Sequence, residues 1–127
     1  MKILLVIGTG SFIGGIFRYL LSQLIHTKFP SSLPYGTLVV NILGCFFIGL
    51  IFALSERINL PQEWRLFLAT GLIGGFTTFS AFSNETVTLI RDGQFWYATV
   101  YITASVLFGL FATFLGFTII KLTSTLN

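Results

Sequence analysis

Hydrophobic residues fill four long runs of this chain, and short polar stretches separate them. Each run reaches the roughly 20 apolar residues that a helix needs to cross the hydrocarbon core of a bilayer. The expected spans are about 3–25, 33–54, 64–90 and 95–120. Pro30, Pro34 and Pro61 lie in or beside the connections, where the missing backbone donor does least harm. The pattern predicts an all-α membrane protein, with a single four-helix transmembrane domain over residues 1–127 and both termini on the same side.

Composition supports a membrane protein and argues against other classes. Hydrophobic residues make up 54% of the chain and charged residues only 9%, whereas soluble domains average about 25% charged residues. A net charge of +3 on isolated lysines and arginines forms no nucleic-acid patch. We expect a multi-pass protein of the inner (plasma) membrane. The first span is expected to be retained, because no small-residue cleavage site precedes Arg18. The connections are too short for a catalytic domain and no catalytic motif is present, so we do not expect an enzyme.

The third span contains the stretch GLIGGFTTFSAFSNE, residues 71–85, which is poorly suited to a plain helix in lipid. Its glycines weaken a helix, and its threonine and serine hydroxyls compete for backbone hydrogen bonds. We therefore expect the helix to break at Gly74–Gly75, near mid-membrane. Lipid offers no partner to freed backbone groups, so such a break must be buried in protein or line a wet cavity. Broken helices are a common way to build ion sites in membranes, and the segment predicts an ion pathway.

Polar and aromatic side chains extend this interpretation. Asn41 lies mid-span in the second helix, with Thr37 one turn before it. A side-chain amide in hydrocarbon either bridges helices or lines a path, and the residues alone leave both possibilities open. Phe79 and Phe82 fall three apart on one face, and their positive ring edges can line an anion path without a cationic trap. Glu85 is the one carboxylate expected at depth.

Basic residues are almost evenly divided between the two expected sides of the membrane. Four lie on the side of the termini and three on the other: Lys2, Arg57, Arg65 and Lys121 against Arg18, Lys28 and Arg91. Orientation is normally fixed by a clear excess, so this balance favours insertion both ways up, and the alternative is a weak signal for a single orientation. Small residues on one face of the first and fourth spans invite close packing and an oligomer, most simply a dimer.

Three segments in order carry a family resemblance: a Gly-rich start that ends in Arg18-Tyr19, then GTLVVNILG at 36–44, then GLIGGFTTFSAFSNE at 71–85. Together they strongly resemble the Fluc (CrcB-type) fluoride channels, over the whole chain. The resemblance implies an antiparallel, dual-topology homodimer in the lipid bilayer, with the third helix broken mid-membrane. It also implies a fluoride-selective channel that exports fluoride passively from the cytoplasm and so reduces fluoride toxicity.

The resemblance also assigns roles to individual residues. Phe79 and Phe82 match the two pore phenylalanines, and Asn41 matches the pore asparagine. Gly74 and Thr77 match positions whose main-chain carbonyls hold a structural sodium ion at the centre of the dimer.

Further positions complete the implied fluoride path. Tyr101 and Ser105 match polar positions of the fourth helix, while Ser80, Ser83, Thr37 and Glu85 continue the polar track. Ala81 departs from the family, since many relatives carry Thr there, and one hydroxyl is missing between the two pore phenylalanines.

Two other functions remain open from the sequence. One is a small dual-topology exporter that moves a cation or an organic solute (a multidrug exporter, for example) in exchange for protons. Such exchangers usually need a central titratable carboxylate, and the first span has none. The other is a non-transporting assembly subunit, which would not require Asn41 and the broken helix to be aligned.

Overall fold

The computed structural model describes residues 1–126, which form helices and short connections only. Four of the segments are long and apolar enough to cross a membrane, so the predicted helical membrane fold is confirmed: Lys2–Lys28, Tyr35–Ile58, Gln62–Arg91 and Phe95–Thr125. The first, second and fourth are single helices, α1 (Lys2–Lys28), α2 (Tyr35–Ile58) and α6 (Phe95–Thr125). The third consists of α3 (Gln62–Arg65), η1 (Leu66–Ile73), α4 (Gly74–Phe76) and α5 (Phe79–Arg91).

The helices extend beyond the hydrophobic runs that predict them. α1 continues through His26 to Lys28, and α5 ends at Arg91. Basic side chains in a last turn interact favourably with the negative end of the helix dipole, so these polar residues prolong the helix where the hydrophobic pattern has already ended.

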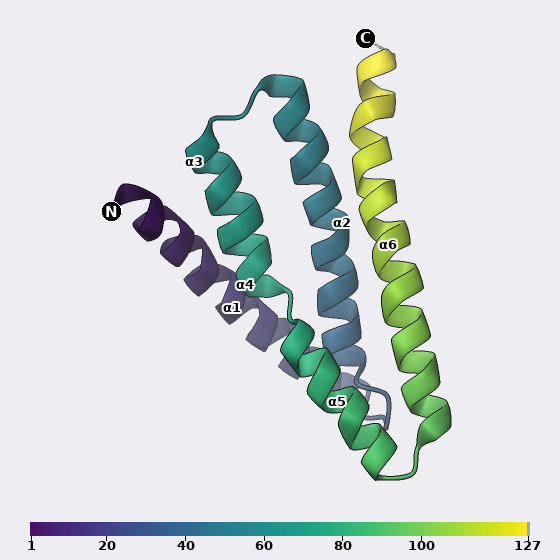
Figure 1. Cartoon of the computed structure of the whole chain (residues 1–127). Helices are drawn as coiled ribbons and strands as arrows, with labels where there is room; N and C mark the ends of the chain where they lie inside the picture. The colour runs from purple at the N-terminus through teal and green to yellow at the C-terminus, as the bar shows by residue number, and fades with distance from the viewer. Residues whose placement is uncertain (127) are drawn as a thin grey trace.

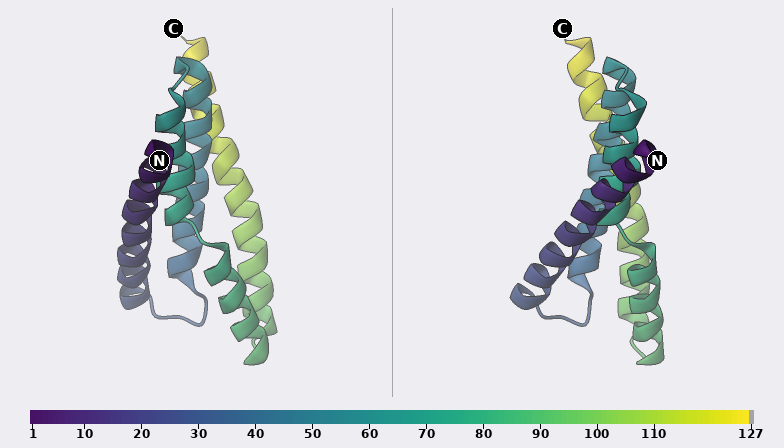
Figure 2. Two further views of the ribbon diagram at one scale, coloured as in Figure 1. Left: turned by 60° about the vertical axis from the view of Figure 1, so that its left-hand side comes forward. Right: turned by 90° about the vertical axis from the view of Figure 1, so that its left-hand side faces the viewer.

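The bundle contains two pairs of adjacent helical segments. α2 and α6 lie side by side along most of their length, whereas α1 crosses the first half of the third span (Figures 1 and 2). Glycines bring the backbones together at both contacts. A Cβ atom at Gly49 would overlap the carbonyl oxygen of Thr113 on α6, and one at Gly14 would overlap that of Leu72 on η1. Gly14 of α1 and Gly116 of α6, where a Cβ would overlap the carbonyl oxygen of Phe46 on α2, thus pack helices within one chain.

The break in the third span lies later than the sequence predicts. Gly74 has helical angles, with φ −61° and ψ −37°, while Thr77 is extended, with φ −82° and ψ 157°. Thr78 is extended as well, with φ −151° and ψ 115°. The predicted break at Gly74–Gly75 is therefore wrong by a few residues. Gly75 serves close packing instead, because a Cβ there would come within 2.5 Å of the carbonyl oxygen of Ser11 on α1.

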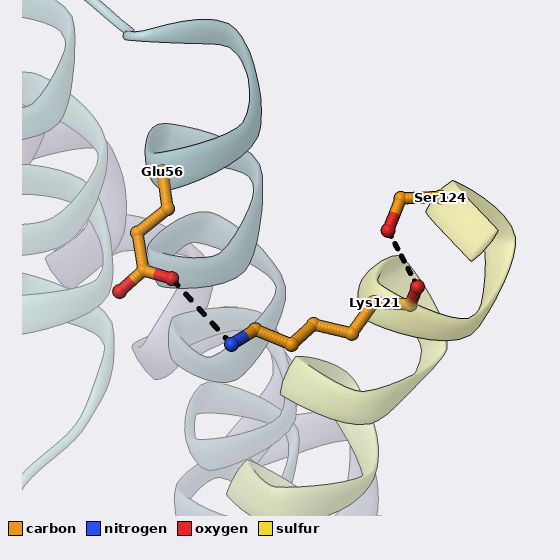
Figure 3. A network of polar contacts seen from close by, with 3 residues as sticks. All are labelled: Glu56, Lys121 and Ser124. Carbon is orange, nitrogen blue, oxygen red and sulfur yellow. Dashed lines mark hydrogen bonds and ion pairs between the residues drawn. The ribbon is translucent and has the colours of Figure 1, made fainter.

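The end of the bundle that carries both termini also carries the connection between α2 and α3 (Figure 1). Lys2 pairs with Glu63 at 2.7 Å, and Lys121 lies 3.9 Å from Glu56. Figure 3 shows the second pair, with the backbone carbonyl of Lys121 accepting a hydrogen bond from the Ser124 hydroxyl at 2.6 Å. Exposed pairs of this kind contribute little stability, but they confirm that the two termini share one side.

Candidate functional site

The side-chain amide of Asn41 holds the break in the third span. Its Nδ2 donates to the carbonyl oxygen of Thr78 at 3.0 Å, and its Oδ1 accepts from the backbone N–H of Thr78 at 2.8 Å. Both backbone groups of an extended residue at membrane depth are therefore satisfied by one side chain of α2. This contact explains how the chain tolerates a non-helical backbone where lipid offers no partner.

Two backbone donors are diverted at the break, and two carbonyls lose their helical partners as a result. In a continuous α-helix the Gly74 carbonyl would accept from the N–H of Thr78, which instead bonds to Asn41. The Thr77 carbonyl would accept from the N–H of Ala81, which instead bonds to the Thr78 hydroxyl at 3.2 Å. The two carbonyls predicted as sodium ligands are the ones deprived of these donors.

A groove of about 400 Å³ runs beside the break between α2, α4, α5 and α6. Its lining contains six of the residues predicted for the anion path and the sodium site: Asn41, Gly74, Thr77, Phe79, Phe82 and Ser105. These residues come from three separate spans, and the fold brings them to one place. Asn41 uses only one of its two Nδ2 protons on Thr78, so the amide retains a donor.

Three aromatic rings follow one another from the surface of the chain into its core. The ring centroids of Phe79 and Phe82 are 5.6 Å apart, and those of Phe82 and Tyr101 are 5.1 Å apart with an interplanar angle of 17°. Tyr101 is fully buried, whereas Phe79 is 79% exposed. Phe82 is thus fixed by stacking, and Phe79 projects away from the core of this chain.

Glu85 forms a second polar centre one helical turn beyond Phe82. Its Oε1 accepts a hydrogen bond from the Thr37 hydroxyl at 2.6 Å, and its Oε2 accepts one from the Tyr101 hydroxyl at 2.7 Å. Thr37 is buried and comes from α2, while Tyr101 comes from α6. Glu85, Thr37 and Arg18 also line a cavity of about 270 Å³. The predicted residues Thr37, Glu85 and Tyr101 therefore form one hydrogen-bonded cluster.

The remaining predicted residues lie at the margin of the site. Ser80 and Ser83 are both exposed, and the Ser80 hydroxyl lies 3.2 Å from that of Thr78. Ala81 lines the cavity that contains Arg18 and Glu85, so a threonine at this position would add a hydroxyl next to that cavity.

Sequence reasoning gave Thr78 no individual role, although Thr78 both caps α5 and contacts Asn41. A threonine that precedes a helix is a usual capping residue, and this signal could have identified it. Among residues 1–126, no three side chains of His, Cys, Asp or Glu are grouped in a way that could hold a metal ion. A cation at the break would therefore depend on backbone carbonyls.

Comparisons with known proteins add independent information. A family model described as "CrcB-like protein, Camphor Resistance (CrcB)" matches residues 5–117. The chain is 44% identical over 116 residues to a protein of Phocaeicola vulgatus named "Fluoride-specific ion channel FluC", a match that covers 91% of this chain and 96% of the relative. A protein of the same name from Campylobacter jejuni is 42% identical over 95% of this chain and 99% of its own length. One from Flavobacterium psychrophilum is 43% identical over 95% and 98%.

Proposed function

We propose that this chain, which belongs to the CrcB-like protein family, is a fluoride-selective ion channel that lets fluoride leave the cytoplasm passively. It is a multi-pass protein of the bacterial inner membrane. The observation that carries the proposal is the groove beside the break, whose lining brings uncharged donors and two aromatic rings together from three spans. Relatives that match nearly the whole chain are named fluoride-specific ion channels. Export of fluoride would reduce its toxicity, and no catalytic step is needed.

The groove offers an anion several weak contacts in place of one strong one. The free Nδ2 proton of Asn41 and the Ser105 hydroxyl are uncharged donors, and the rings of Phe79 and Phe82 present positive edges. Conduction requires binding that is favourable enough for entry but weak enough for release. A lysine or arginine in the groove would hold fluoride too tightly, and none lines it. The proposed path continues from the groove to Thr37, Tyr101 and Glu85, with Ser80 and Ser83 near its exposed side.

A sodium ion at the break is the second part of the proposal. The residues fit such an ion, because the Gly74 and Thr77 carbonyls have lost their usual helical donors to Asn41 and Thr78. Carbonyl oxygens without a carboxylate suit a hard monovalent cation. The ion would supply positive charge at the centre of the assembly and would link the breaks of two chains.

The third part is an antiparallel homodimer of dual topology. One chain leaves the Phe79 ring 79% exposed at membrane depth, which is explained if a second copy covers it. The end with the termini carries four basic residues and the opposite end three, so orientation is weakly specified. A second copy inserted upside down would bring two breaks face to face and produce two symmetry-related anion paths.

A proton-coupled exporter remains the contrasting mechanism, and the named relatives give it no support. Fluoride flux from vesicles separates the two. A channel dissipates a fluoride gradient without a proton gradient, whereas an exchanger stops when the proton gradient is absent. An assembly subunit would give no flux at all.

A further inference from the structure

Glu85 already occupies two of the hydroxyl donors that an anion would need. Its two carboxylate oxygens accept from Thr37 at 2.6 Å and from Tyr101 at 2.7 Å. Both distances are those of short, charge-assisted bonds between a hydroxyl and a carboxylate. We propose that the Glu85 carboxylate is a tethered competitor of fluoride, which must be displaced from the Thr37 and Tyr101 hydroxyls whenever an anion passes. This inference rests on the proposed channel function.

The competition follows from counting protons. A hydroxyl carries a single proton to donate, and both protons here are given to Glu85. Fluoride has no proton of its own, so at these two hydroxyls it can bind only where the hydroxyl proton is free to be donated. The carboxylate and a fluoride ion therefore exclude each other at these two hydroxyls.

The donors are held in place, so displacement must move the carboxylate. Tyr101 has no exposed surface and its ring stacks on Phe82 with centroids 5.1 Å apart. Thr37 is 6% exposed. Glu85, in contrast, lines two cavities, one of about 270 Å³ and one of about 440 Å³. The carboxylate has room to turn while the hydroxyls stay.

Charge favours movement of the Glu85 carboxylate into one of these two cavities. Arg18 lines the smaller cavity and Asp92 the larger one. Neither of the two ion pairs found within residues 1–126 includes Arg18, so its guanidinium is available to a displaced carboxylate. Asp92 would repel the carboxylate on the other side. We infer that Glu85 turns toward Arg18 when fluoride takes its place.

The test measures initial fluoride efflux from liposomes as a function of the internal fluoride concentration, for wild type and Glu85→Ala. Removal of the competitor frees both hydroxyls, so the concentration that gives half-maximal flux should fall by about tenfold or more, because the loss of even one charged hydrogen bond corresponds to about tenfold. The maximal flux should fall as well, because tighter binding slows exit. Glu85→Gln keeps the volume of the side chain and should produce a smaller change in the same direction.

Two controls make the test specific. Glu56→Ala removes an exposed carboxylate near the termini and should leave both parameters unchanged. In a Thr37→Val, Tyr101→Phe background, removal of Glu85 should no longer lower the half-maximal concentration, because no donors remain to be freed.

The outcomes separate the inference from the proposed function. If wild type carries no fluoride, the channel function itself is wrong. If wild type conducts and Glu85→Ala has an unchanged half-maximal concentration, the competitor role is wrong. If removal of Glu85 lowered the half-maximal concentration equally in the background that lacks the two hydroxyls, the competitor role would also be wrong, since Glu85 would then act by another route.

Discussion

The side-chain amide of Asn41 makes the two hydrogen bonds that a continuous helix would otherwise give to the backbone of Thr78. Its Oδ1 accepts from the Thr78 N–H at 2.8 Å, and its Nδ2 donates to the Thr78 carbonyl oxygen at 3.0 Å. One side chain thus stabilises the break and still has a proton left for the groove. The two possibilities that the sequence left open for Asn41, a bridge between helices and a place in a path, are compatible in this geometry.

Asn41→Asp should abolish fluoride flux and destabilise the protein. Aspartate can still accept from the Thr78 N–H, but it cannot donate to the Thr78 carbonyl, and a negative charge would face the groove. An unsatisfied buried carbonyl costs about 1–3 kcal/mol. Thermal unfolding in detergent and flux in liposomes measure the two effects. Asn84→Asp changes an exposed amide on α5 and should leave stability unchanged. Normal flux in Asn41→Asp would remove Asn41 from the path.

Phe79→Ile and Phe82→Ile should both reduce flux strongly but should differ in stability. Phe82 stacks on Tyr101, and loss of such a pair costs about 0.5–1.5 kcal/mol. Phe79 is 79% exposed in one chain, so its replacement should leave the fold of the chain intact. Phe114→Ile, on the exposed face of α6, is the control for loss of a ring. If both variants retained wild-type flux, these two rings would contribute to packing only and not to the fluoride path.

Sodium removal should weaken the dimer, and Thr78→Ala should increase the sodium concentration that the dimer needs. Without the Thr78 hydroxyl, the N–H of Ala81 can return to the Thr77 carbonyl and compete with the ion. Loss of the cap also costs about 1 kcal/mol. Size-exclusion chromatography over a sodium titration checks both effects, with Thr88→Ala, an exposed threonine of α5, as control. If dimer formation did not depend on the sodium concentration in either the wild type or Thr78→Ala, the sodium site would be excluded.

The sequence predicts the four spans well because lipid imposes a simple rule, about 20 apolar residues per helix. It also predicts that the third span is broken, from the glycines and hydroxyls of residues 71–85. It misplaces the break, because the conformations of Gly75 and Thr78 depend on distant residues: Ser11 packs against the glycine, and Asn41 bonds to the threonine.

The cluster around Glu85 shows the same limit. Its partners lie 48 and 16 positions away in the chain, and no local pattern links them. Composition identifies Glu85 as an unusual carboxylate at depth, but only the packing of α2 and α6 against α5 selects Thr37 and Tyr101 as its donors.

Orientation should be easy to bias if the chain inserts both ways. Asp92→Lys and Gln94→Lys combined with Arg57→Gln change the basic count from four against three to three against five and should force most copies one way. Arg91→Gln together with Lys28→Gln leaves four against one and should favour the other orientation. Each set of changes expressed alone should lose flux, and co-expression of the two should restore it. Normal flux from a population shown by cysteine labelling to have one orientation would rule out the antiparallel dimer.

Fluoride efflux from liposomes that contain the purified protein tests the central claim most directly. Vesicles loaded with fluoride and chloride are diluted into medium without either ion, valinomycin balances the charge with potassium, and electrodes follow both anions at equal internal and external pH. The account predicts rapid release of fluoride with chloride retained, and no change when the proton gradient is varied. Release of both anions at similar rates, or fluoride release only in the presence of a proton gradient, would contradict it.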